Sequence, residues 1–180
     1  MVELMKMNHS WVFVIASAIA IAPAWAYTCG TESGASPSTP AERFKDNGNG
    51  TLTDIKSGMT WMRCALGQNW NGTTCTGTPA GYNWQAAQDE AVKLDKEGYG
   101  GFSDWRVPQI PELAMIVETQ CSDPRINLTL FPATPAAYFW SATSGRGARI
   151  GAYMLSFGPE GANAGGKEEL HYVRLMRSGK

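Results

Sequence analysis

The stretch from Asn83 to Glu118 limits what this chain can fold into more than any other part of the sequence. Its first half carries four apolar residues at helical spacing: Trp84, Ala87, Ala91 and Leu94. This spacing predicts a helix that buries one narrow stripe. Asn83 suits the N-cap, because its side-chain oxygen can accept a backbone N–H, and Gly98 suits the left-handed position after the last turn.

A corner with the sequence Trp-Arg-Val-Pro follows at residues 105–108. Pro108 favours an extended Val107, so a second helix is expected to begin near Ile110. Its predicted inward face is formed by Leu113, Ile116 and Val117. Two helices this short are not stable alone, so the surrounding strands must cover them.

Residues 1–26 have the features of a signal peptide. Lys6 supplies a basic start, residues 11–22 are apolar, and Ala24-Trp25-Ala26 is a small-x-small cleavage site. The apolar run is shorter than the roughly 20 residues of a membrane span. We therefore expect an exported protein, located in the periplasm, at the cell surface or outside the cell, without a membrane span after signal removal. An uncleaved N-terminal anchor is the alternative.

Four cysteines lie beyond this segment, and an even number in an oxidising compartment predicts two disulfides. Three pairings are open. The turn-rich polar loop between Cys64 and Cys75 favours that pair, which leaves Cys29 with Cys121. The spacing lacks the C-x-x-C pattern of a zinc site, so no metal is expected there.

Residues 27–42 are rich in Ser, Thr, Pro and Gly and predict a flexible lead-in, so the folded domain is expected over residues 43–180. The formal net charge of −1 argues against a general nucleic-acid binder. Asn47-Gly48 predicts a hairpin turn within residues 43–63. The oxygen-rich loop from Asp46 to Asp54 fits turn chemistry, and calcium binding there stays open.

The C-terminal part has three further patterned segments and one glycine-rich stretch. Strands are expected at residues 138–143, 150–157 and 171–177, with a mobile connection at 158–166. The last strand alternates, which predicts Tyr172 and Arg174 on the opposite face from Val173 and Leu175. Strands, helices and strands in this order predict an α+β fold with antiparallel sheets.

Tryptophan is abundant, with seven residues in the chain. Four lie in patterned elements and are predicted to anchor the core: Trp61, Trp84, Trp105 and Trp140. Trp70 instead lies in the polar loop between Cys64 and Cys75. It could serve as a sugar-stacking platform or pack over the disulfide.

The last third of the chain carries several basic residues, among them Arg146, Arg149, Lys167, Arg174 and Arg177. Ordinary surface charge is one interpretation of each of them. If the sheet brings the arginine loop beside Lys167, the guanidinium groups could bind sulfate or carboxylate bidentately. Catalysis is not expected, because His171 is the only histidine after the first 26 residues and is interpreted as a surface strand residue. No cofactor is expected.

Several segments together resemble a known family: Asp46-Asn-Gly-Asn-Gly-Thr-Leu-Thr-Asp54, Gly58-Met-Thr-Trp-Met-Arg63, Asn83-Trp84, Asp104-Trp-Arg-Val-Pro108, Phe139-Trp-Ser-Ala-Thr143 and Tyr172-Val-Arg-Leu-Met-Arg177. They look like the C-terminal domain of the bacterial collagen-like adhesin Lcl, a domain long catalogued as one of unknown function in exported bacterial proteins. The resemblance implies a fold similar to C-type lectin-like domains and formylglycine-generating enzymes, with two short helices on twisted antiparallel sheets. It also implies binding of sulfated glycosaminoglycans through basic residues.

The sequence thus predicts an exported, non-enzymatic binding module that recognises an anionic glycan, such as a sulfated one. The predicted ligand-binding residues are Arg146, Arg149, Lys167 and Trp70. The fold-defining residues are Trp84, Trp105, Arg106, Pro108 and Trp140. The alternative is a structural or assembly component of the envelope or a pilus, in which residues 158–166 meet a protein partner. The oligomeric state is left open.

Overall fold

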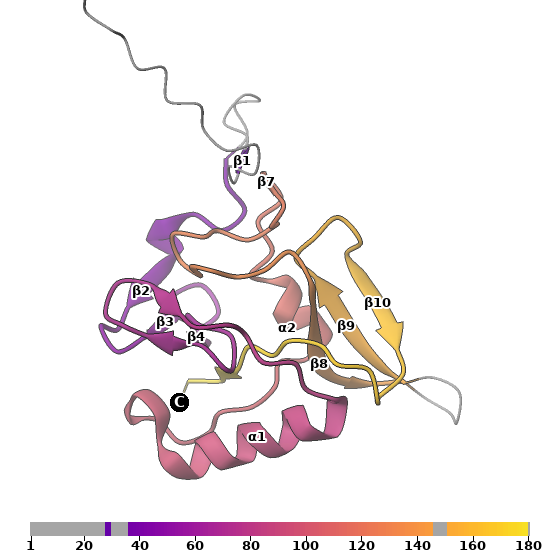
Figure 1. Cartoon of the computed structure of the whole chain (residues 1–180). Helices are drawn as coiled ribbons and strands as arrows, with labels where there is room; N and C mark the ends of the chain where they lie inside the picture. The colour runs from indigo at the N-terminus through magenta and orange to yellow at the C-terminus, as the bar shows by residue number, and fades with distance from the viewer. Residues whose placement is uncertain (1–27, 30–35, 146–150, 180) are drawn as a thin grey trace, which may run out of the picture.

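The structure is a computed structural model, which describes residues 28–29, 36–145 and 151–179. Within these residues it has two α-helices, α1 (Trp84–Glu97) and α2 (Ile110–Ala114), and two 3-10 turns, η1 (Ala41–Arg43) and η2 (Tyr99–Gly101) (Figure 1). Its strands are β1 (Thr28–Cys29), β2 (Phe44–Asp46), β3 (Thr51–Asp54), β4 (Thr60–Met62), β5 (Asn69–Trp70), β6 (Cys75–Thr76), β7 (Cys121–Ser122), β8 (Tyr138–Ser144), β9 (Ala152–Ser156), β10 (Ala162–Gly165) and β11 (Met176–Arg177).

The strands pair into antiparallel sheets, which confirms the predicted α+β class. One sheet has the order β11-β4-β3-β2, a second has the order β10-β9-β8, and β1-β7 and β5-β6 form separate pairs. In the first sheet Met176 lies opposite Trp61, so the last strand closes onto the early meander. The likeness to C-type lectin-like domains stays a prediction.

Helix α1 begins and ends where its caps predict. The side chain of Asn83 accepts a hydrogen bond from the backbone N–H of Ala86 at 2.8 Å, and Gly98 adopts φ 73° in the left-handed region. Ala87 and Ala91 are buried on the inner face. The stripe at helical spacing therefore packs against the domain as predicted.

The corner between the helices is held by buried side chains and by an ion pair. Trp105, Val107 and Pro108 are buried, and the Trp105 indole donates to the Tyr99 carbonyl at 2.9 Å. Arg106 binds both oxygens of Glu112, at 2.7 and 2.6 Å. The corner thus fixes the direction in which the chain enters α2.

Helix α2 begins at Ile110 as predicted but ends earlier than expected, at Ala114. Glu112 completes a capping box by accepting the backbone N–H of Gln109 at 2.7 Å. Ile116 and Val117 therefore lie after the helix, although Ile116 is still fully buried. The inward-facing residues were predicted correctly, but they do not all belong to one helix.

Strand β8 lies between two clusters of buried side chains. Phe139 and Trp140 are both fully buried, and successive strand residues point to opposite faces. Phe139 belongs to the cluster that contains Leu113 of α2, whereas Trp140 belongs to the cluster that contains Ala87 of α1. One face of β8 therefore contributes to the cluster around α2, and the other face contributes to the cluster around α1.

Two C-terminal predictions were wrong. The stretch from 158 to 166, expected to be an unstructured connection, contains β10, which pairs with β9 and is the outer strand of its sheet among the described residues. The alternation expected at 171–177 also fails, because Val173, Arg174, Leu175 and Met176 are all buried. Only β11 remains as a strand of that segment.

The C-terminal end of the predicted flexible lead-in is anchored. The carboxylate of Glu118, itself 1 % exposed, accepts the backbone amides of Ser38 and Thr39 at 3.0 and 2.7 Å. Hydroxyl groups of the same two residues donate to it as well. Ser38 and Thr39 are therefore tied to Glu118, and the flexibility expected for residues 27–42 stays a prediction.

Both predicted disulfides are present, Cys64–Cys75 within the polar loop and Cys29–Cys121 between β1 and β7. The β1-β7 pair lies at one end of the molecule and α1 at the opposite end (Figure 1). The Asn47-Gly48 hairpin joins β2 and β3 as predicted, with Gly48 at φ 76°.

Candidate functional site

The two arginines predicted to bind an anion, Arg146 and Arg149, lie outside the described residues. The residues that flank them are described. Gly145 N–H donates to the Gly151 carbonyl at 3.0 Å, and a Cβ placed on Gly151 would lie 1.7 Å from the Gly165 carbonyl oxygen. The two ends of the arginine segment therefore lie together, beside the last residue of β10.

Lys167 follows this end of β10 by two residues. Its ammonium nitrogen lies 4.0 Å from the centroid of the Trp84 ring, a cation–π distance, and its carbonyl accepts the Trp84 backbone N–H at 2.9 Å. The Trp84 indole in turn donates to the Ser141 carbonyl at 2.9 Å. Lys167 is thus held near the N-terminus of α1, on the side of the domain where the arginine segment begins and ends.

Trp70, the predicted stacking residue, is half-buried and lies in the β5-β6 hairpin opposite Cys75. The Arg63 guanidinium lies 4.3 Å from its ring centroid and so covers one ring face. The Trp70 side chain also packs close to Gly50, where an added Cβ would lie 2.9 Å from it. At most one face of the ring is left for a ligand.

Two other basic residues of the last third are already engaged. Arg174 is fully buried and donates to the Met62 carbonyl at 2.9 Å, to the Arg63 carbonyl and to Thr134 Oγ1 at 2.6 Å. Burial lowers the pKa of Arg174 to about 9. Arg177 pairs with Asp104. Arg174 is therefore a core residue, whereas the sequence predicted a surface charge.

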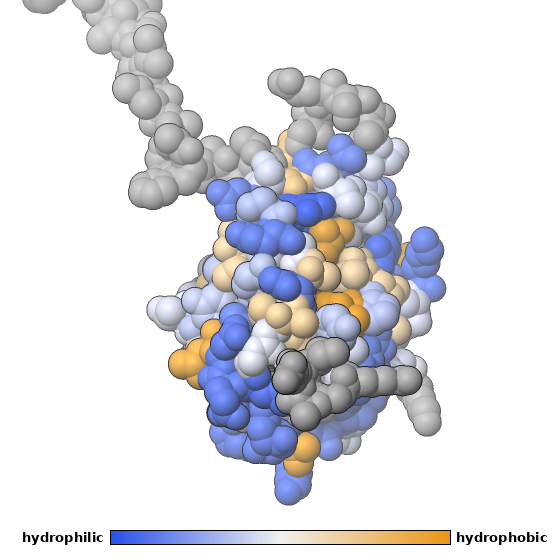
Figure 2. Space-filling view, turned by 90° about the vertical axis from the view of Figure 1, so that its right-hand side faces the viewer, coloured by the Kyte–Doolittle hydropathy of each residue, from blue (hydrophilic) through white to orange (hydrophobic). Residues whose placement is uncertain are grey.

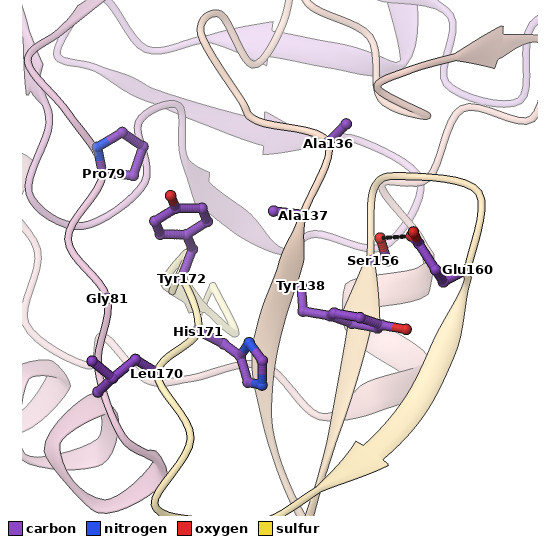
Figure 3. Close-up of a pocket in the computed structure, with 10 residues that line it drawn as sticks. All are labelled: Pro79, Gly81, Ala136, Ala137, Tyr138, Ser156, Glu160, Leu170, His171 and Tyr172. Atoms are coloured by element: carbon purple, nitrogen blue, oxygen red, sulfur yellow. Dashed lines mark hydrogen bonds between the residues drawn. The ribbon is translucent and has the colours of Figure 1, made fainter.

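A hollow lies where β8 begins, β9 ends and the chain approaches β11 (Figure 3). It has a volume of about 530 Å³. Its lining comes from four separate segments: Pro79 and Gly81; Ala136, Ala137 and Tyr138; Ser156 and Glu160; and Leu170, His171 and Tyr172. Sequence reasoning missed this hollow, since these segments are adjacent only in the fold.

The side chains of the hollow are oriented by their neighbours. Ser156 Oγ donates to Glu160 Oε2 at 2.6 Å, and this hydrogen bond lowers the pKa of Glu160. The His171 ring lies edge-on to Tyr138 and to Trp140, with centroids 5.6 and 4.7 Å apart, and its Nε2 is 3.1 Å from Glu169 Oε2. The histidine expected on the surface is thus largely covered.

Hydroxyl, imidazole and carboxylate groups all occur around this hollow. The serine hydroxyl and the imidazole are not hydrogen-bonded to each other, as they would be in a site with an activated serine. Ser156 Oγ is bonded to Glu160, whereas His171 is paired with Glu169. Activation of a serine requires a base within hydrogen-bond reach, and that base is usually histidine. The arrangement offers polar binding groups and no aligned pair of nucleophile and imidazole.

The two carboxylates that bound the oxygen-rich segment 46–54 are both paired with arginines outside it. Asp46 pairs with Arg63 at 2.7 Å and Asp54 pairs with Arg43 at 2.6 Å. Across the described ranges, no three His, Cys, Asp or Glu side chains gather as they would around a metal ion. In the same ranges, no helix is long and apolar enough to cross a membrane.

The comparisons with known proteins identify a family. No curated protein matches the chain significantly. The family model of the Lcl C-terminal domain matches residues 50–177, which is more than half of the chain and includes both helices and β3 to β11. The chain therefore belongs to the Lcl C-terminal domain family.

Proposed function

We propose that this chain is an exported, non-enzymatic binding module that recognises an anionic glycan, such as a sulfated one. The proposed contacts are Lys167 and the arginines of the adjoining segment, Arg146 and Arg149. The observation that carries the proposal is the hydrogen bond between Gly145 and Gly151, because these residues flank the arginines and lie beside Gly165.

The chemistry of these groups supports an anionic ligand. Guanidinium groups bind sulfate and carboxylate bidentately, and an ammonium adds a positive charge beside them. Lys167 is fixed on Trp84 before any ligand arrives, so less side-chain entropy is lost on binding. Trp70 contributes its remaining ring face at most.

Retention on immobilised heparin tests this proposal. We expect retention at low salt that weakens as salt is added, since exposed charges are screened over about 10 Å at 0.1 M. The combined variant Arg146→Ala, Arg149→Ala and Lys167→Ala should elute much earlier. The combined variant Lys45→Ala, Lys56→Ala and Lys96→Ala is the control, because it also removes three positive charges, all from exposed lysines. Absence of retention at low salt would exclude the proposal.

A second candidate, assembly with a protein partner, is supported by β10. This outer strand carries Ala162, Asn163 and Ala164, all exposed and uncharged, and outer strands without charges are prone to pair with another chain. The face of the molecule on which β10 lies shows weakly apolar surface among hydrophilic residues (Figure 2).

Ala164→Lys tests the assembly candidate, because a lysine on an edge strand opposes strand addition. Pull-down of partners and sedimentation of the protein alone are compared for the wild type and this variant. The control is Val92→Lys, which places a lysine at an exposed position of α1. Loss of a partner or of self-association only in Ala164→Lys would favour assembly over glycan binding. Equal binding and self-association in the two variants would show that β10 is not the contact surface.

A further inference from the structure

The hollow of Figure 3 differs in charge from the Lys167 end of the domain. Among its ten lining residues there is neither lysine nor arginine, and Glu160 is the only carboxylate. The hydrogen bond from Ser156 keeps this carboxylate oriented and favours its ionised form. An anionic ligand would be repelled there, so the hollow cannot serve the same ligand group as Lys167.

Two aromatic rings supply flat apolar surface on different sides of the hollow. In Figure 3 the Tyr172 ring points to the Pro79 side and the Tyr138 ring to the Glu160 side. They do not enclose one point as an aromatic cage for a single cation would. The layout instead fits a ligand larger than a small cation, with one apolar face toward each ring.

The rings are held in place before a ligand binds. Tyr172 lies 5.7 Å from the Phe139 ring, and Tyr138 lies 5.6 Å from the His171 ring. Among the described residues, neither phenol hydroxyl has a hydrogen-bond partner. The hollow therefore combines fixed apolar faces with unused hydroxyls and one oriented carboxylate, as binding sites with a few placed polar groups do.

We propose that this hollow binds a sugar ring that carries no negative charge. A pyranose offers C–H faces for the tyrosine rings and hydroxyl donors for the Glu160 carboxylate, which forms strong charge-assisted hydrogen bonds. The volume of about 530 Å³ lies within the range of small-molecule sites. This site is separate from the one proposed at Lys167 and does not depend on it.

Chemical-shift titration of the oxidised, isotope-labelled protein tests the proposal. The neutral probes are the methyl glycosides of glucose, galactose and mannose, together with N-acetylglucosamine, each added up to about 10 mM to capture weak binding. The anionic counterparts are glucuronate for glucose and N-acetylglucosamine, galacturonate for galactose and mannuronate for mannose. We expect saturable shifts at the amides of Glu160, His171 and Tyr172 with at least one neutral probe, and an affinity for its uronate at least about tenfold lower.

Matched variants assign the effect to the hollow. Glu160→Gln should reduce the discrimination against the uronate, whereas Glu168→Gln, an exposed change of the same kind, should leave it unchanged. Tyr138→Leu should weaken the neutral sugar at least about fivefold, and Tyr153→Leu, on exposed β9 surface, should not.

Three results would overturn the proposal. They are absence of saturable shifts with every neutral probe, equal affinity for a neutral sugar and its uronate, and equal effects of Glu160→Gln and Glu168→Gln. None of them bears on heparin retention, so this site and the Lys167 site succeed or fail separately.

Discussion

The carboxylate of Glu118 lies 2.7 Å from the backbone amide of Thr39, a residue 79 positions earlier in the chain. Further donors reach the same carboxylate from Ser38 and from Gln120. Burial alone would raise the pKa of Glu118, but these hydrogen bonds outweigh it and lower the pKa from 4.5 to about 2. The domain thus uses one buried anion to hold the segment before β2.

Glu118 should therefore make the free energy of unfolding fall at acidic pH. A depressed pKa contributes stability that is present above about pH 5 and is lost as the pH falls toward 2. This contribution amounts to about 3 kcal/mol. Urea unfolding midpoints measured from pH 7 to 2 should fall steeply in the wild type. Glu118→Gln should be less stable at pH 7 and show a flatter acid profile, while Glu168→Gln should follow the wild type. An unchanged profile in Glu118→Gln would contradict this assignment.

The folded protein should tolerate an uncharged side chain at position 174 better than a charged one of different shape. Lysine keeps the charge but cannot reach Met62, Arg63 and Thr134 together, so a buried cation is left underbonded. We expect Arg174→Lys to lower the free energy of unfolding by about 3 kcal/mol and Arg174→Met to lower it less. Chemical denaturation gives both values, and Arg177→Lys serves as the control. The reverse order of the two Arg174 variants would show that the charge itself is needed.

The two disulfides should differ in their contribution to stability. Cys29–Cys121 closes 92 residues of sequence and Cys64–Cys75 closes 11. In the chain-entropy description these loops correspond to about 4.5 and about 3 kcal/mol. Thermal unfolding of the two paired Cys→Ser variants should therefore show the larger loss for Cys29 and Cys121. A larger loss for the short loop would mean that packing around Cys64 outweighs chain entropy.

The cap of α1 should be worth about 1 kcal/mol. Asn83→Ala removes the acceptor for the Ala86 amide, whereas Asn83→Asp retains one. The melting temperature should fall in the first variant and change little in the second. Asn163→Ala on exposed β10 controls for loss of an amide side chain, and it should melt as the wild type does.

Local features of the sequence were sufficient to predict α1, the corner and the β2-β3 hairpin. Each depends on a cap, a proline or an Asn-Gly turn within a few residues, so neighbouring side chains decide the conformation. Strand β10 could not be predicted in this way, because it depends on pairing with another strand. Residues 162–165, Ala-Asn-Ala-Gly, have no alternating pattern and form β10 only because β9 lies beside them.

The candidate site was predictable only in part, for the same reason. The sequence made the nearness of Lys167 and the arginine segment depend on the sheet, and it is the β9-β10 pairing that brings Gly165 beside Gly151. Arg174 looked like a surface residue, since alternation with Val173 placed it on the opposite face, yet both are buried. Tyr138, Glu160 and Tyr172 share a hollow through sheet pairing and an isolated bridge between Phe139 and Tyr172, which no local pattern reveals.

The Cys29–Cys121 bond has a mechanical consequence for the folded domain. When the chain is pulled between its N-terminal strand and Gly179, the force passes through the cystine and bypasses residues 30–120. The length that stretching can release falls from about 500 Å to about 200 Å, at about 3.5 Å per residue. The segment that carries both helices then cannot be drawn out, so reduction of this bond would turn a short tether into a long one.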